Sequence, residues 1–310
     1  MNTQASSCSS NLEIMEIGGL SPKTNCYGYI EGYKSVNSEI GLILPTYCEA
    51  ANIRKLIEEI ENLNLNITIL VIDDSSPDGT ANIVRNLQKK YGNILLFTRL
   101  GKYGLGTAIT DGFKTFLSFK KPPRNIITMD ADYSHNPKDI PRLLNLAEKG
   151  YDLVIGSRYL PGGKTENWSP VRIMLSKIAN SLSSVIIRAR IKDCTSGFRC
   201  YSTRLLKKII RELHSQTYEI QIETVRQAVK KGSLVREIPI TFANRKLGKS
   251  KLTLNEIKQF ISYILKAQFE DFFSVSKRVY FNKHKPYLSY TISQDVSNFT
   301  IRSKRDEINT

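Results

Sequence analysis

Residues that form disulfides or bind zinc are scarce in this sequence, and their spacing is unsuitable for either role. The five cysteines stand at positions 8, 26, 48, 194 and 200, and no two of them form a Cys-x-x-Cys pair. The three histidines are scattered, and none completes a zinc-binding spacing with a cysteine. We therefore expect neither a disulfide framework nor a zinc centre, and reduced thiols indicate a cytosolic protein.

Long apolar runs are also missing from the chain. No stretch approaches the ~18–20 apolar residues that a bilayer-spanning helix needs. The first residues are polar and acidic, whereas a secretory signal would begin with cations and continue with an apolar block. We therefore expect a protein that is soluble or peripherally attached to a membrane.

Acidic residues are outnumbered by basic ones. The 45 lysines and arginines against 29 acidic residues give a net charge of +16 and a pI near 9.6. The expected partner is polyanionic: nucleic acid, an anionic membrane surface or a phosphorylated substrate. Hydrophobic residues make up 41% of the 310 positions, enough for one large domain or two modest ones.

The chain divides into four segments by pattern. Residues 1–38 are rich in Ser, Asn and Gly, which predicts a flexible extension, with a short hairpin around Tyr27–Tyr33 as one option. Residues 39–252 alternate strand and helix patterns, which predicts an α/β fold with a mostly parallel central sheet. For residues 253–285 we expect an amphipathic helix followed by a basic segment. For residues 286–310 we expect a disordered tail.

The amphipathic helix has two open interpretations. Its apolar stripe includes Ile257, Ile261, Ile264 and Leu265, and its other face is mixed in charge. This mixture favours packing against the domain or a partner over simple adsorption to a membrane. The cations at positions 277, 278, 283 and 285 could still contact anionic headgroups.

Individual elements follow from apolar periodicity. Predicted strands are Ile40–Leu44, Ile67–Ile72, Ile94–Phe97, a strand from Asn125, Asp152–Ile155 and Leu234–Thr241. Predicted helices cover about Ala50–Leu63, the residues up to Tyr91, those up to Phe119, Pro137–Lys149, Ser169–Ala189, Thr203–Glu212 and Tyr218–Lys231.

The central motif is a pair of aspartates after a strand. The apolar run from Asn125 ends in Asp130 and Asp132, and side chains two apart in an extended segment point the same way. Hard divalent ions take oxygen ligands and often use one or two carboxylates together with substrate phosphates. An isolated Asp-x-Asp is usually a solvated pair that starts a turn. Its position at the end of a buried strand favours a metal site here, because open α/β sheets bind ligands at that edge.

Other polar residues follow neighbouring strands. Tyr47 and Glu49 come after the first strand of the alternating region, and Asp74 comes after the second. Right-handed crossovers place these ends on one edge of the sheet, which predicts a nucleotide-binding crevice. The loop Gly101–Gly106 has neither the dinucleotide fingerprint nor a Walker lysine, and its pattern favours a tight turn that starts a helix.

Two further patterns are open to more than one interpretation. Ser169 is a good N-cap, and the apolar helix after it has Arg172, Ser176 and Asn180 every four residues. This stripe is either a solvent-facing stripe or an anion site beside an apolar surface, as an acceptor with a lipid tail would need. The four cations in residues 244–251 are either a solvated face or part of a lid over phosphates.

Seven motifs occur in order along the chain: Pro45–Glu49, Asp73–Thr80, Leu105–Ala108, Met129–Asp132, Gly156–Tyr159, Asp193–Arg199 and the segment from Arg245 to Lys251. Together they resemble the motifs of the dolichyl-phosphate (polyprenyl-phosphate) mannose synthases, which are family 2 inverting glycosyltransferases with the GT-A fold. The resemblance covers about residues 39–265 and is to the type without transmembrane spans.

The resemblance implies a role for each matching residue. Asp130 and Asp132 would hold Mg²⁺ or Mn²⁺ on the donor diphosphate, with the Ala131 backbone alongside, and Arg158 would join these two aspartates as the third catalytic residue. The residues implied for the nucleoside are Pro45, Tyr47, Glu49, Ile72 and Asp74; those gripping the donor are Arg158, Arg245 and Lys251; those receiving the lipid phosphate are Arg172 and Ser176. Cys48 and Ser134 stand where many members have Asn and Gln.

The implied reaction is inverting transfer of mannose from GDP-mannose to a dolichyl or polyprenyl phosphate at the cytoplasmic surface of a membrane. The acceptor phosphate is already anionic, so positioning and stabilisation of the leaving diphosphate suffice, without a strong general base. Expected partners are an anionic membrane surface and, as an option, a small membrane-anchoring protein. One rival is a UDP-glucose-dependent glucosyltransferase. A nucleic-acid-binding protein would interleave cations with aromatics, and is not expected because acids cluster at the strand ends.

Overall fold

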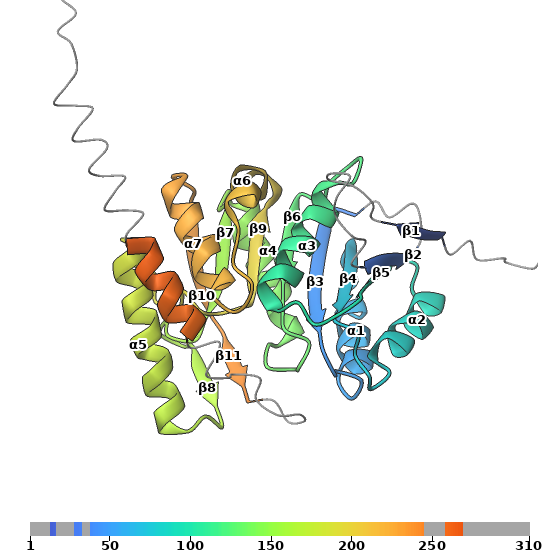
Figure 1. Cartoon of the computed structure of the whole chain (residues 1–310), viewed down its shortest axis with the longest axis horizontal. Helices are drawn as coiled ribbons and strands as arrows, with labels where there is room; N and C mark the ends of the chain where they lie inside the picture. Colours follow the sequence, from blue (N-terminus) through green and yellow to red (C-terminus); the bar gives the residue numbers. More distant parts are fainter. Residues whose placement is uncertain (1–12, 17–27, 33–37, 245–257, 269–310) are drawn as a thin grey trace, which may run out of the picture. The chain divides into compact units, whose positions relative to one another are not determined.

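The computed structural model describes residues 13–16, 28–32, 38–244 and 258–268 (Figure 1). Arg245, Lys251, the cations at positions 277–285 and the predicted tail lie outside the described residues. The expectations for these segments therefore remain expectations.

The described residues form a nine-stranded sheet in the order β1-β2-β5-β4-β3-β6-β9-β7-β10. The strands β3, β4, β5 and β6 run parallel to one another, while β9 runs antiparallel between β6 and β7. The strand bounds are β1 Glu13–Glu16, β2 Gly28–Gly32, β3 Ile40–Thr46, β4 Ile67–Asp73, β5 Ile94–Arg99, β6 Asn125–Thr128, β7 Leu153–Ser157, β9 Arg199–Ser202 and β10 Val235–Pro239. A second sheet pairs β8 Lys164–Glu166 with β11 Thr241–Ala243.

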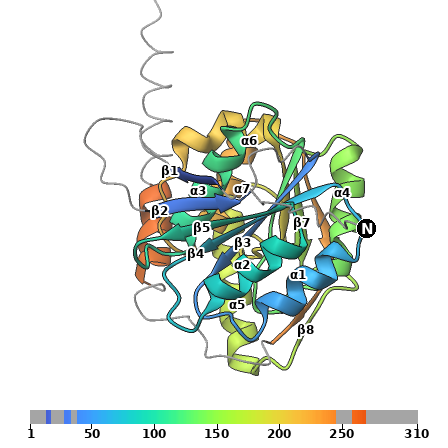
Figure 2. The same cartoon turned by 90° about the vertical axis from the view of Figure 1, so that its right-hand side faces the viewer.

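Helices cover both faces of the large sheet. Their bounds are α1 Ile53–Glu61, α2 Thr80–Lys90, α3 Leu105–Leu117, α4 Ile140–Glu148, α5 Pro170–Ile187, α6 Thr203–Ile209 and α7 Ile220–Lys230, with short 3₁₀ turns at Pro137–Asp139 and Ile210–Glu212. One core cluster joins α3, α6 and α7 to one face, and a second joins α1, α2 and α4 to the other (Figure 2). The strands supply both clusters because neighbouring side chains alternate: Ile43 belongs to the first, Leu42 and Leu44 to the second. The predicted α/β fold with a mostly parallel central sheet is confirmed.

Two predicted elements differ from the observed ones, and strand β9 was not predicted. The strand predicted at Leu234–Thr241 is two strands, because β10 ends at Pro239, which has no N–H to donate, and β11 pairs with β8 instead. Gly28–Gly32 is a single strand between β1 and β5, not a hairpin. The antiparallel strand β9 was not predicted, since its four residues are flanked by a polar loop and a helix and are too few for a periodic signal.

Residues 258–268 form a helix that packs against α5. Ile264 and Ala267 are buried beside Ile186 of α5, with Phe260 and Tyr263 next to them. Arg226 of α7 donates a hydrogen bond to the carbonyl of Ala267 at 3.0 Å. The prediction that this stripe packs against the domain is therefore confirmed for Ile264.

Candidate active site

The carboxyl ends of β3, β4 and β6 meet at one edge of the sheet. Thr46 pairs with Asp73 in the register of β3 and β4, and the Asp74 N–H donates to the Thr46 carbonyl at 3.2 Å. On the other side of β3, the Met129 N–H donates to the Ile43 carbonyl. The loops that hold Tyr47, Asp74 and Asp130 therefore begin beside one another, as the chain order predicts.

Asp74 is held by a buried arginine that the motifs do not include. Nε of Arg99 donates to Asp74 at 2.6 Å, and its Nη1 donates to Asp111 at 3.2 Å. The Arg99 side chain is fully buried, and the Tyr103 N–H donates to the second Asp74 oxygen at 3.2 Å. Asp74 is thus fixed in place at the end of β4. The link joins residues 25 positions apart, so no local pattern reveals it.

The other residues implied for the nucleoside differ in how much side chain they present. Pro45 and Tyr47 are partly exposed, and Lys102 Nζ lies 4.4 Å from the centre of the Tyr47 ring. Glu49 is buried and accepts a hydrogen bond from Asn52 at 2.9 Å. Ile72 is fully buried in the core, so only its backbone can contribute to binding.

The glycine loop is a tight turn, as its pattern predicts. Gly104 has a φ of 95°, and the Gly106 N–H donates to the Gln216 carbonyl at 2.9 Å. A Cβ at position 106 would lie 2.4 Å from the carbonyl oxygen of Ser215. Glycine is therefore required here for close packing at the start of α3, independently of any ligand.

Asp130 and Asp132 lie in the bend that follows β6. The strand ends at Thr128, so both aspartates lie beyond it. The expectation that they point the same way assumed an extended segment, which this bend is not. The Asp130 side chain is 36% exposed, whereas Asp132 is buried. Ser134 donates to Asp132 from its N–H at 3.0 Å and from its hydroxyl at 2.5 Å. Ser134 thus orients Asp132.

His135 supports the same bend from inside the protein. Its Nδ1 accepts a hydrogen bond from the Asp130 N–H at 3.3 Å, and its ring stacks on Phe198 at 5.1 Å. Burial lowers the pKa of His135 to about 4, so the imidazole is neutral at physiological pH. A neutral ring of this kind can accept the backbone hydrogen bond that shapes the bend.

The donor set at this bend suits a hard divalent ion that shares its ligands with a substrate. Among the described residues, no group of three or more His, Cys, Asp or Glu side chains is placed to hold a metal. Two carboxylates, one of them open to solvent, match the way Mg²⁺ and Mn²⁺ are held by few protein oxygens plus phosphates and water. Asp130 and Asp132 therefore fit such an ion bound jointly with a diphosphate.

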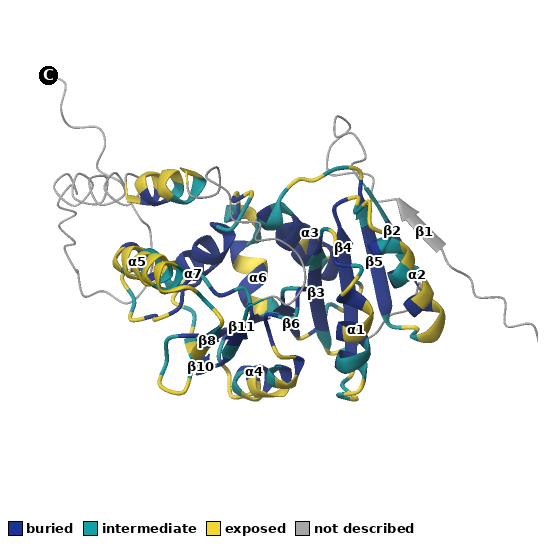
Figure 3. Ribbon diagram, turned by 90° about the horizontal axis from the view of Figure 1, so that it is seen from below, coloured by how far each residue is buried: buried dark blue, intermediate teal, exposed yellow. Residues whose placement is uncertain are grey.

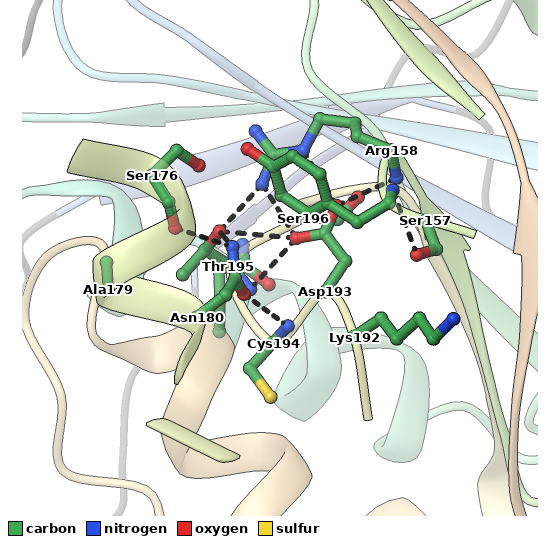
Figure 4. A network of polar contacts seen from close by, with 12 residues as sticks. Ser157, Arg158, Ser176, Ala179, Asn180, Lys192, Asp193, Cys194, Thr195 and Ser196 are labelled. Atoms are coloured by element: carbon green, nitrogen blue, oxygen red, sulfur yellow. Dashed lines mark hydrogen bonds and ion pairs between the residues drawn. The ribbon is translucent and has the colours of Figure 1, made fainter. Parts of the chain in front are cut away.

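Arg158, at the end of β7, is bound on two sides by Asp193 and Thr195 (Figure 4). Its Nε and Nη2 each donate to an oxygen of Asp193 at 2.7 Å, and Nη2 also donates to Thr195 at 2.6 Å. Burial would raise the pKa of Asp193, but Arg158 beside it holds that pKa below its usual value. The guanidinium is therefore held in position, with its charge balanced by the ionised Asp193.

The polar stripe of α5 faces the protein. Asn180 is only 4% exposed; it accepts from the Cys194 N–H at 2.7 Å and donates to the Thr195 hydroxyl at 3.1 Å (Figure 4). Arg172 donates to Asn244 at 3.0 Å. The solvent-facing interpretation of the stripe is therefore wrong for Asn180. The stripe borders the Asp193–Ser196 loop and Arg158.

One aromatic cluster joins these parts. The ring of Phe242 lies 5.1 Å from His135 and 5.3 Å from Trp168, and 5.4 Å from the Arg158 guanidinium. Trp168 also lies 3.9 Å below the Arg172 guanidinium, a cation–π contact. The carboxylate bend and the arginine of α5 therefore belong to one connected site. Trp168 was not among the predicted residues, although the single Trp of the chain was a signal.

Comparison with known proteins identifies the family. The model of glycosyl transferase family 2 matches residues 42–210, more than half of the chain. The chain belongs to glycosyl transferase family 2. The polyprenol monophosphomannose synthase of Mycolicibacterium smegmatis is 38% identical over 220 residues, 70% of this chain and 82% of that protein. The undecaprenyl-phosphate mannosyltransferase of Micrococcus luteus is 34% identical over 212 residues, 68% of this chain and 86% of that protein.

Solved structures agree on the fold of this family 2 transferase. Glucosyl-3-phosphoglycerate synthase from Mycobacterium tuberculosis, in complex with Mn²⁺, UDP and glucosyl-3-phosphoglycerate, aligns with a TM-score of 0.54. The alignment covers 76% of this chain and 80% of that one at 15% identity, which supports the shared fold alone. The predicted GT-A fold and the predicted enzyme class, a glycosyltransferase, are confirmed.

Within the described ranges, no helix of the transferase is both long and apolar enough to cross a bilayer. The resemblance to the polyprenyl-phosphate mannose synthases agrees with the names of the two curated relatives.

Proposed function

We propose that this family 2 transferase moves mannose from GDP-mannose to a polyprenyl or dolichyl phosphate, with inversion at the sugar carbon. The names of its two curated relatives support a mannosyl donor and a polyprenyl phosphate acceptor. The observation that carries the proposal is the joined cluster of Asp130, His135, Phe242, Trp168 and Arg172. It brings a carboxylate pair suited to a donor diphosphate into one site with a cation suited to an acceptor phosphate.

On the donor side, the chain's own residues orient the nucleotide. Tyr47 offers a partly exposed ring, and Asp74, fixed by Arg99, offers a carboxylate at the end of β4. Asp130 and Asp132 would hold Mg²⁺ or Mn²⁺, which supplies positive charge to the leaving diphosphate when bound. Arg158, held by the ionised Asp193, presents a guanidinium within electrostatic reach of Asp130.

On the acceptor side, Arg172 and Ser176 would receive the lipid phosphate. That phosphate is anionic at neutral pH and can attack without losing a proton to the protein. His135 is buried and neutral with a pKa of about 4, so it is unsuited to act as a general base at neutral pH. The residues therefore contribute by positioning the two substrates in line and by stabilising the developing charge.

The polyprenyl chain of the acceptor also indicates where the enzyme would work. A polyprenyl phosphate stays in its membrane, so the transferase would work at the cytoplasmic surface, where its net charge of +16 favours anionic lipid. A small membrane-anchoring partner is an additional option that this proposal does not require.

A transfer assay tests the proposal. Radiolabelled GDP-mannose, UDP-glucose and UDP-mannose are each incubated with a short-chain polyprenyl phosphate and Mg²⁺, Mn²⁺ or a chelator. We expect label in the lipid fraction only from GDP-mannose, and none with the chelator. Transfer from UDP-glucose instead would establish the glucosyltransferase rival, and equal turnover with the chelator would contradict the metal role of Asp130 and Asp132.

A further inference from the structure

The helix α5 exposes large apolar residues that an ordinary surface helix would bury. Asn180 and Ser183 are buried with Ile186 and Ile187, whereas several large apolar residues are exposed. Figure 3 shows α5 mostly in the colour of exposed residues. The exposed set is Val171, Met174, Leu175, Ile178, Leu182 and Val185. Val185 is 71% exposed, more than any other large apolar side chain in the described residues. A surface helix normally turns such residues toward the core.

The apolar patch continues onto residues 258–268. Ile261 and Leu265 of that helix are each 52% exposed, and the two helices touch through Ile186, Ile264 and Ala267. Figure 1 shows the helix at residues 258–268 directly beside α5. An open groove also runs along α5, lined by apolar residues including Ile173, with Lys177 at its edge. Contiguous exposed apolar surface of this kind marks an interaction site.

The charged residues within the two segments that carry the patch have one sign. Residues 170–192 and 258–268 contain no Asp or Glu. The exposed cations in these segments are Lys177, Arg188, Arg190, Lys192, Lys258 and Lys266. An apolar stripe whose own segments carry only cations complements an anionic lipid surface. Two copies of this face would instead oppose positive to positive, which disfavours a dimer through it.

We propose that the outer side of α5, together with residues 258–268, docks on an anionic lipid monolayer, with α5 lying in the headgroup region. This docking proposal rests on the proposed function in one respect. If the acceptor is a lipid phosphate, docking explains how that phosphate reaches the site. The inner side of the same helix contains Asn180 and borders Arg158 through Thr195. A helix about 10–12 Å across would thus separate the acyl boundary from the phosphate-binding side chains by one helix diameter.

Vesicle flotation tests the docking face in the full-length chain. The parent, Val185→Glu, Met174→Glu/Val185→Glu and the control Leu234→Glu are floated with vesicles of phosphatidylcholine containing phosphatidylglycerol, and with phosphatidylcholine alone. Leu234 is a matched control because it is 59% exposed and lies outside the patch. We expect the double variant to lose at least about tenfold in partitioning into the anionic vesicles, with Leu234→Glu unchanged.

A depth measurement separates this face from any other contact the chain makes with lipid. Val185→Trp and Leu234→Trp both retain Trp168, so they share the same background fluorescence. With vesicles of brominated lipid, we expect the tryptophan at position 185 to be quenched strongly and the one at position 234 to be unaffected. Equal quenching at the two positions would overturn the proposal even if the chain floats.

Other results of these experiments would also decide for or against the docking face. A parent chain that does not float with anionic vesicles, or a double variant that floats as well as the parent, would overturn the docking face. A parent that dimerises in solution while Met174→Glu/Val185→Glu is monomeric would assign the patch to a second copy instead. If the parent docks through α5 but transfers mannose to no acceptor, the proposed function fails and the docking face stands.

Discussion

At the scale of single residues, the site depends on side chains whose positions are fixed by a neighbour. Asp132 is oriented by Ser134, Asp74 by Arg99, and Arg158 by Asp193. In each pair the implied site residue follows a strand and was predicted, whereas the contact with its partner was not. The strand end is visible in the sequence, but for Asp74 and Arg158 the side chain that meets it comes from another segment and depends on packing.

Asp132 tests the role of the carboxylate bend. Asp132→Asn keeps the shape of the side chain and its contact with Ser134 but removes one negative charge from the site proposed to hold the cation. We expect transfer activity to fall by orders of magnitude, with an unchanged midpoint of thermal unfolding. Ser134→Ala, which removes one hydrogen bond to the same carboxylate, is the matched control and should lose less, about tenfold. Near-normal turnover of Asp132→Asn in saturating GDP-mannose and Mn²⁺ would remove Asp132 from this role.

Arg172 tests the acceptor phosphate. A charge-assisted contact to a phosphate contributes about 1.5–3 kcal/mol, so Arg172→Ala should raise KM for the polyprenyl phosphate by about tenfold or more. The affinity for GDP, measured by calorimetry, should stay within about twofold, because Arg172 is assigned to the acceptor side. Equal losses for GDP and the acceptor would contradict the assignment.

Trp168 tests whether the aromatic cluster positions Arg172. The cation–π contact at 3.9 Å contributes about 0.5–2 kcal/mol to holding the guanidinium. Trp168→Leu should therefore raise KM for the acceptor by several-fold, and Trp168→Phe, which restores an aromatic face, should recover part of the loss. If the two variants behave alike, the ring does not act through Arg172.

At the scale of elements, the sequence predicts strands and helices better than it predicts which way a helix faces. The apolar periodicity of α1 agrees with its burial, since Ile53, Leu56, Ile57 and Ile60 are fully buried. The stripe of α5 was open to two interpretations, and in the structure its Asn180 is buried while several large apolar residues of the helix are exposed. Periodicity gives two opposite faces of a helix, and only the partners on each side decide which is inside. For α5 those partners are Cys194 and Thr195, both in the loop that follows the helix.

The Arg158–Asp193 pair joins two elements that are 35 positions apart in the chain, β7 and the loop before β9. Arg158→Met would leave the Asp193 carboxylate buried without its cation, and breaking a buried pair in this way costs about 3–5 kcal/mol. We expect this loss in the free energy of unfolding by urea at neutral pH, with Arg158→Lys intermediate. A variant as stable as the parent would show that Asp193 is satisfied by its other donors.

The same pair has a signed pH dependence. Arg158 lowers the pKa of Asp193 in the folded state, so the pair stabilises the fold above the unfolded-state pKa and this stability is lost as the pH falls through the folded-state value. In Arg158→Met the carboxyl loses its cation and its pKa rises. The difference in unfolding free energy between parent and variant should therefore be largest at about pH 7 and shrink toward about pH 4. If the difference in unfolding free energy stays constant with pH, the substitution does not change the pKa of Asp193 in the folded protein.

At the scale of the whole molecule, the excess of positive charge predicted a polyanionic partner but did not distinguish among nucleic acid, lipid and a sugar nucleotide. The family assignment and the acidic strand ends favour the sugar nucleotide. The cations on the segments that form the α5 patch add a reason for lipid. Net charge is a property of composition, whereas the choice of partner depends on where the charges gather, which only the fold determines.

Ionic strength tests this division of roles. Transfer to a polyprenyl phosphate embedded in anionic vesicles is compared with transfer to the same acceptor in neutral vesicles, at about 0.05 M and about 0.5 M salt. The Debye length falls from over 10 Å to a few ångströms across this range, so attraction of exposed cations to the surface is screened. We expect the ratio of the two rates to be well above one at low salt and to approach one at high salt. Because the donor is the same in both arms, weaker GDP-mannose binding at high salt cancels from the ratio. A ratio that does not change with salt would mean that the exposed cations around α5 do not bring the enzyme to its acceptor.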